Sequence, residues 1–376
     1  MPACEQSATA FLVFACVQLS LIARLYALCM ENTPAAPTNL SPDLLQPGMI
    51  TACLGKAAIE APPAMLAQLV SAGLDLLPFP GRGSTLLRWQ MLAAVAAHDL
   101  SLVKLYEGHT DALAILAELE GGPPPPGSVW GVWCAEPPGA RVSIEGSPAP
   151  GAAVRLRGVK AWCSGAADVS HALVSAWDAD GRPWLVAVAM RQDGIRVLQG
   201  GWQAVGMAST GTAEVAFSGA EAFCVGASGA YVQRPGFWHG GAGIGACWYG
   251  AAAELGRMMQ SAGGEPDAHR LAHLGAVDCA LSAVRALLHS SAAVIDAEPS
   301  GDAMALAMRV RLAVEAAATV VMRHAGEALG ARPFCLDRKF ARLMADLPVF
   351  LRQSHARRDE AALGRIAHDR QQGWAL

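Results

Sequence analysis

The spacing of apolar residues changes twice along this chain, and this constrains the fold more than any other feature. From residue 62 to residue 120 apolar side chains recur at helical spacing, which predicts helices. A run of glycine and proline at 121–127 (GGPPPPG) then stops the helical pattern. After Pro235 the helical spacing returns in long segments rich in alanine and leucine. The chain is therefore predicted to form helices, then a region of another kind, then helices again.

The middle region has the spacing of a β domain. Short β-like runs are separated by turn signals such as DADG at 178–181 and DG at 193–194. The predicted strands cover residues 129–134, 153–159, 172–177, 184–190, 195–198 and 214–218. Short strands at this spacing favour an antiparallel barrel or sandwich, and we expect a β-barrel.

The last region predicts a bundle of four helices. Its long segments cover residues 240–261, 267–296, 303–329 and 337–363, with short Gly- and Pro-containing connections between them. The predicted fold class is therefore α+β. We divide the chain into an extension and linker (1–48), a helical domain (49–122), a β-barrel (123–232) and a helical bundle (233–376).

Composition excludes several classes of protein. Of 376 residues, 53% are apolar and 16% are charged, which suits a chain with a large core. The net charge of −4 provides no basic field for nucleic acid. The ten cysteines form no C-x-x-C pair, so we expect no zinc ribbon and no metal site. Scattered cysteines in a core-rich chain are typical of buried thiols in the cytoplasm.

The first thirty residues allow two interpretations. Residues 10–30 are mostly apolar, but no basic segment precedes them and no clean cleavage site follows them. A signal or membrane anchor is one interpretation. The other is an extension ahead of a start at Met30, which begins a more ordinary sequence.

Four short segments together resemble the acyl-CoA dehydrogenase superfamily. They are CAEP at 134–137, GVKAWCSGA at 158–166, VGMAST at 205–210 and EALGARPF at 327–334. The resemblance covers roughly residues 60–365 and includes the same order of helices, barrel and bundle. It implies that the chain binds FAD between the barrel and the bundle.

The resemblance also implies which residues contact the flavin. Backbone at Cys134, Ala135 and Glu136 would line the ring, Trp162 would stack on it, and Ser164 would hydrogen-bond its edge. On composition alone, the favoured interpretation is structural: Trp162 would be a tryptophan of the barrel and Ser164 a serine in a turn.

The segment at 327–334 is similar to the family's Q-x-x-G-G-x-G-F sequence, which contacts the adenosine half of the flavin, commonly across a subunit interface. This implies contacts from Glu327 and Gly330 and a homo-oligomer. Asp346 falls at the family's R-D motif, with Ala345 in place of arginine. The family's R-x-x-F-G element, expected near 263–273, is not found.

The catalytic base of an acyl-CoA dehydrogenase is a carboxylate that removes a proton as hydride leaves to the flavin. The family position for this base falls on Ser354 or His355, neither of which is acidic. A second family position, near residues 237–239, also lacks glutamate. Glu107 and Glu254 are the outside candidates.

The leading prediction is α,β-dehydrogenation of an acyl thioester in fatty acid metabolism, with an electron-transfer flavoprotein as partner. Flavin monooxygenases of the same fold are the first alternative, because they resemble this chain in the CSGA turn at 163–166 and in a histidine near the C-terminus. His355, joined by His109, would then be catalytic, and a flavin reductase would be the partner. Both histidines also fit ordinary helix positions. The second alternative is a silent relative that acts as a binding or scaffold protein.

Overall fold

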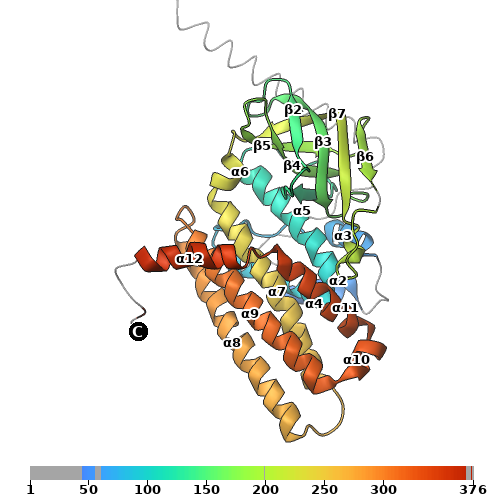
Figure 1. Cartoon of the computed structure of the whole chain (residues 1–376), viewed down its shortest axis with the longest axis vertical. Helices are drawn as coiled ribbons and strands as arrows, with labels where there is room; N and C mark the ends of the chain where they lie inside the picture. Colours follow the sequence, from blue (N-terminus) through green and yellow to red (C-terminus); the bar gives the residue numbers. More distant parts are fainter. Residues whose placement is uncertain (1–44, 56–60, 199, 370–373, 375–376) are drawn as a thin grey trace, which may run out of the picture.

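The computed structural model describes residues 45–55, 61–198, 200–369 and 374. A small barrel lies at one end of the molecule, and a bundle of long helices extends from the other side of α5 (Figure 1). This arrangement confirms the predicted α+β fold of helices, barrel and bundle. The apolar segment at 10–30 lies outside the described residues.

The N-terminal helices are α2 (Pro47–Leu54), α3 (Pro62–Ser71), α4 (Thr85–His98) and α5 (Leu100–Glu118). Proline begins α2 and α3, where a missing N–H costs nothing. Asp99 separates α4 from α5 with an extended backbone, and its carboxylate accepts a hydrogen bond from the Leu102 N–H at 2.8 Å. Leu45 is buried, so the last few residues of the predicted linker belong to the folded domain.

The barrel strands are β1 (Trp130–Trp133), β2 (Val142–Glu145), β3 (Ala153–Cys163), β4 (His171–Trp177), β5 (Pro183–Ala189), β6 (Ile195–Leu198) and β7 (Ala213–Val225). The ring β4–β2–β3–β7–β5 closes because β5 also pairs with β4, while β1 and β6 pair with β4 and β7. The closed barrel agrees with the prediction, although the pairs β1–β4 and β2–β4 are parallel rather than antiparallel. The short strand β2 was not predicted.

The bundle contains α7 (Pro235–Ser261), α8 (Ala268–Ala297), α9 (Met304–Leu329) and α11 (Arg338–Phe350), with the short helices α6 (Ala230–Gln233) and α10 (Ala331–Leu336). The predicted helix at 337–363 is interrupted. Pro348 lies in the last turn of α11, and Ala356 has a φ of 43°, so the chain turns before α12 (Arg357–Asp369). Two short 3-10 helices, η2 (Ala208–Thr210) and η3 (Leu351–Gln353), complete the order.

Small residues allow α7 to pack closely against its neighbours. A Cβ at Gly250 would lie 2.2 Å from the Ala93 carbonyl oxygen, so only glycine permits this approach of α4 and α7.

Helix α8 is long and apolar enough to cross a membrane by length and composition alone, and only 17% of that stretch is buried. A cavity of about 340 Å³ between α7 and α8 contains none of the predicted site residues in its lining.

Candidate functional site

The motif segments of the barrel meet at the end of β3. The Trp133 indole N–H donates to the Ser164 carbonyl at 3.1 Å, which ties the segment after β1 to the turn after β3. The Gly165 N–H donates to the Thr210 carbonyl at 2.9 Å, which brings in the segment at 205–210. Three segments that are far apart in sequence therefore form one surface.

The bundle helix α11 attaches to this surface through Asp346. Its carboxylate accepts a hydrogen bond from the Met207 N–H at 2.5 Å. Gly206 is required beside it, because a Cβ there would lie 2.1 Å from the Ala345 carbonyl oxygen. The polar contact of Asp346 thus joins barrel and bundle where the flavin was predicted.

Trp162 presents its indole to solvent at this junction. Its side chain is 57% exposed, whereas Ala161 and Cys163 on either side are buried. Its φ is +57°, which is rare for a residue other than glycine. The pairing of β3 with β7 shifts register between Lys160 and Cys163, so a bulge turns the tryptophan outward. An exposed flat indole suits the stacking of a planar ring.

Hydroxyl groups lie next to this indole in the chain. Ser164 Oγ is 3.1 Å from Thr212 Oγ1, which is in turn 2.7 Å from Thr210 Oγ1. The Thr210 hydroxyl donates its proton to the Met207 carbonyl at 2.7 Å, so Thr212 donates to Thr210 and Ser164 donates to Thr212. Ser164 Oγ is thereby left as an acceptor for a donor on the edge of a bound ring. Thr212 was not singled out from the sequence.

The Glu136 carboxylate is bonded to side chains of β3 and β4 rather than left free for a ligand. Its carboxylate accepts hydrogen bonds from Lys160 Nζ at 3.1 Å, Ser175 Oγ at 2.7 Å and Trp177 Nε1 at 2.9 Å. Burial alone would raise the pKa of Glu136, but the hydrogen bonds and the Lys160 charge outweigh it, and the pKa is lowered. Lys160 is fully buried, so this carboxylate is its counter-ion.

Cys134 and Ala135 follow β1 at the edge of the barrel. Ala135 is exposed, which leaves the backbone there accessible. The Cys134 thiol is hydrogen-bonded to the Tyr231 side chain, and burial raises the pKa of the thiol to about 11. Cys134 is therefore a neutral thiol at physiological pH.

His109 has a structural position. It is buried on α5, with Nε2 3.0 Å from Asp75 Oδ2 and Nδ1 accepting the Trp130 N–H at 3.2 Å. Both ring nitrogens are therefore used to hold α5 against β1 and the segment after α3. This arrangement leaves no nitrogen for the catalytic role that we predicted.

Ser354 and His355 lie in the turn between η3 and α12. The Ser354 hydroxyl accepts the Ala356 N–H at 3.1 Å, and His355 Nδ1 is 3.4 Å from Asp359 Oδ1 with a side chain 63% exposed. Within the described part of the chain, these contacts stay inside the turn and do not reach the barrel motifs. The structure does not bring these two residues together with Trp162.

The two outside carboxylates are both held in ion pairs. Glu254 accepts two hydrogen bonds from Arg257, each 2.7 Å, and one from Lys339 at 2.6 Å. Glu107 accepts from Lys104 Nζ at 3.0 Å. Both oxygens of Glu254 are thus occupied, whereas Glu107 is held through its Oε2 atom.

A different carboxylate, that of Asp111, lies where α5 meets the start of α7. Its Oδ2 is 3.9 Å from Arg234 Nη2, and Arg234 also pairs with Glu118 at 2.7 Å. Its Oδ1 is buried and has no hydrogen-bond partner among the described residues. Burial raises the pKa of Asp111, against the opposing effect of the Arg234 charge.

The free oxygen of Asp111 faces the first turns of α7. A Cβ at Gly240 would lie 3.1 Å from Asp111 Oδ1, so glycine leaves space beside this oxygen. This turn directly follows residues 237–239, the second place where a base was sought. Asp111 was missed, although its spacing of four from Glu107 on an apolar helix placed both acids on one face.

The predicted adenosine contacts lie at the end of α9. Glu327 is exposed, and its Oε2 is 3.7 Å from His273 Nδ1. Gly330 follows α9 with a φ of +64°, which suits glycine.

Comparison with solved structures identifies the fold. No protein-family model matches the sequence, and a search of curated proteins by sequence finds no match. The FMN-bound form of TdsC, a dibenzothiophene monooxygenase from Paenibacillus sp. A11-2, is similar in structure with a TM-score of 0.70 and 19% identity, over 82% of this chain and 92% of that chain.

Two further structures lead to the same fold. KijD3 with FMN and a dTDP-amino sugar has a TM-score of 0.69 and 19% identity, over 83% of this chain and 88% of that chain. A variant of the Tcur3481-Tcur3483 steroid ACAD has a TM-score of 0.64 and 17% identity, over 86% of this chain and 93% of that chain. These likenesses, together with the barrel and bundle described above, show that this chain has the acyl-CoA dehydrogenase fold.

Proposed function

We propose that this chain is a flavin-dependent oxidoreductase acting on a small molecule, with the flavin ring stacked on Trp162. The single observation that supports this is an indole held outward in a left-handed backbone beside the hydroxyls of Ser164 and Thr212. These groups fit a planar ring with polar edges, and structures of TdsC and KijD3 contain FMN. FAD remains our prediction for this chain, with FMN as the alternative.

For the reaction, we propose α,β-dehydrogenation with Asp111 as the base. A bound flavin supplies a hydride acceptor. The protein itself would take the proton from the carbon next to the carbonyl. The acceptor would be Asp111 Oδ1, which has no hydrogen-bond partner among the described residues. A raised pKa makes this carboxylate a stronger base than a solvated aspartate. Arg234 would remain its counter-ion as the proton moves.

Monooxygenation is the second candidate, because the similar structures include a dibenzothiophene monooxygenase. TdsC has been solved with indole and KijD3 with a dTDP-amino sugar, which agrees with a small-molecule substrate here. The redox partner, an electron-transfer flavoprotein or a flavin reductase, follows the reaction class and stays a prediction. A homo-oligomer also stays a prediction.

The reaction class is tested by anaerobic spectroscopy on the full chain reconstituted with FAD or FMN. Bleaching of the flavin band by an acyl-CoA, abolished in Asp111→Asn while flavin stays bound, would support the proposal. The monooxygenase would be favoured by a different result. In that case no acyl-CoA bleaches the bound flavin, but the reduced flavin yields an oxygenated product when it is exposed to O₂ and an aromatic substrate. Failure to bind either flavin would contradict both reactions.

A further inference from the structure

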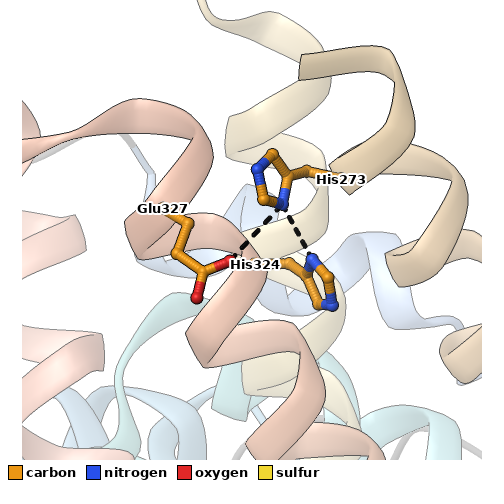
Figure 2. Close-up of side chains that lie close together, drawn as sticks. All are labelled: His273, His324 and Glu327. Atoms are coloured by element: carbon orange, nitrogen blue, oxygen red, sulfur yellow. Dashed lines mark hydrogen bonds and ion pairs between the residues drawn. The ribbon is translucent and has the colours of Figure 1, made fainter. Parts of the chain in front are cut away.

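Two histidines and a glutamate from neighbouring helices face one another near the α7–α8 turn (Figure 2). His273 lies on α8, and His324 and Glu327 lie one turn apart on α9. The two Nδ1 atoms are 2.8 Å apart, and Glu327 Oε2 is 3.7 Å from His273 Nδ1. All three potential ligand atoms lie within 4.8 Å of one another. We call these three residues the His–His–Glu cluster.

The backbone that carries the cluster is firmly held. Arg270, one turn before His273, donates to the carbonyl oxygens of Met259 and Gly263, each at 3.1 Å, and to that of Ala262. These contacts cap the C-terminal end of α7 and fix the turn that leads into α8. His273 is therefore presented to α9 by a rigid element rather than by a loose loop.

The protons on the two histidines follow from their neighbours. A distance of 2.8 Å between two ring nitrogens requires one proton between them. Arg323 Nη2 lies 2.9 Å from His324 Nε2 and can only donate, so Nε2 of His324 accepts. His324 then carries its proton on Nδ1 and donates it to Nδ1 of His273.

We propose that the His–His–Glu cluster is a binding site for one divalent transition-metal ion of the zinc class, which joins α8 to α9. Two imidazole nitrogens and one carboxylate oxygen are a common protein ligand set for Zn²⁺, with the fourth position left to water. Arg270, which lies outside the cluster, holds the backbone before His273 in place through its hydrogen bonds to the end of α7. This site is separate from the barrel motifs, and it shares only Glu327 with the predicted flavin contacts.

Binding requires two small adjustments. Tetrahedral ligands at about 2.0–2.1 Å from zinc are roughly 3.3 Å apart, so the imidazoles must separate slightly from their present contact. The His324 proton must also move from Nδ1 to Nε2, which then no longer accepts from Arg323. Arg323 is exposed and can turn toward solvent. Arg323 thus competes with the metal, and its removal is expected to strengthen binding.

The test is a zinc titration of the chelator-treated full chain against a chromophoric competitor, with circular dichroism to confirm folding of each variant. We expect one zinc per chain. His273→Ala and His324→Ala should each weaken affinity by about 100-fold or more, since loss of an outer-shell partner alone costs roughly 10–100-fold. Arg323→Gln should strengthen affinity several-fold. The matched control is His289→Ala, an exposed histidine on α8 outside the cluster.

X-ray absorption at the zinc edge identifies the ligands directly. The proposal predicts nitrogen and oxygen neighbours at about 2.0–2.2 Å and no sulfur at about 2.3 Å. Sulfur neighbours would assign the metal to exposed thiols such as Cys279 or Cys335 and overturn the proposal. Affinity that is unchanged in folded His273→Ala and His324→Ala, or the lack of stoichiometric binding, would also overturn it.

Discussion

The carboxylates of Glu136 and Asp111 differ in how fully they are hydrogen-bonded. Glu136, which follows β1, accepts from Lys160, Ser175 and Trp177, and its pKa is lowered. Asp111, between α5 and α7, keeps one buried oxygen without a partner among the described residues, and its pKa is raised. A saturated carboxylate stabilises a fold but has little capacity for chemistry, whereas an unsaturated one costs stability and remains reactive. The resemblance assigned only the backbone at Glu136 to the flavin, and the carboxylate of Glu136 is structural. The carboxylate of Asp111, which was not predicted, is the better candidate for catalysis.

The largest expected effect is on stability, from Glu136→Ala. This change leaves the buried Lys160 ammonium without its counter-ion, which should lower the free energy of unfolding by about 3 kcal/mol or more. Urea denaturation followed by circular dichroism measures it. Glu145→Ala is the matched control, since its pair with Arg157 lies at the barrel surface, and it should have no measurable effect. Equal stability of the two variants would remove the distinction between Glu136 and an ordinary surface acid.

Asp111→Asn should have the opposite profile. Turnover should fall by about 100-fold or more if Asp111 is the base, while stability at neutral pH should be kept or increased. Because the folded-state pKa is raised, the wild type binds more protons when folded and loses stability as pH rises from about 4, the region of the unfolded value. The stability advantage of Asp111→Asn should therefore grow with pH through that window.

Denaturation at a series of pH values, combined with kinetics, checks this prediction. Glu107→Gln, on the same helix face but already paired with Lys104, is the control and should leave turnover largely intact. Normal turnover in Asp111→Asn would show that Asp111 is not the base, and it would strengthen the monooxygenase alternative. A loss of stability would show that the carboxylate of Asp111 is also structural.

The order of the elements could be predicted because the spacing of apolar residues reports directly on helices and strands. Strand β2 was missed because four residues give too little alternation to detect. The histidines were a harder problem. His109 pairs with Asp75 and the Trp130 backbone, and such tertiary partners leave no mark in the local sequence.

The same reason explains why Asp111 and the His–His–Glu cluster were not predicted. Arg234 follows Glu118 by 116 residues, and His324 follows His273 by 51 residues, so only the packed helices bring these groups together. Sequence motifs, by contrast, singled out Trp162 and Ser164, whose flavin contacts stay predictions. The turn at 162–165 depends on a bulge and a left-handed residue within the motif itself.

The central claim, that flavin stacks on Trp162, is tested most directly by titrating FAD and FMN into the full chain with Trp162→Gly, Trp162→Phe and the wild type. The predicted result is an affinity loss of roughly 10-fold or more for glycine, a smaller loss for phenylalanine, and no loss of stability, since glycine fits a φ of +57°. Trp374→Ala, which removes an indole 92% exposed, is the control. Flavin binding that is equally tight in the wild type and in Trp162→Gly would contradict the account.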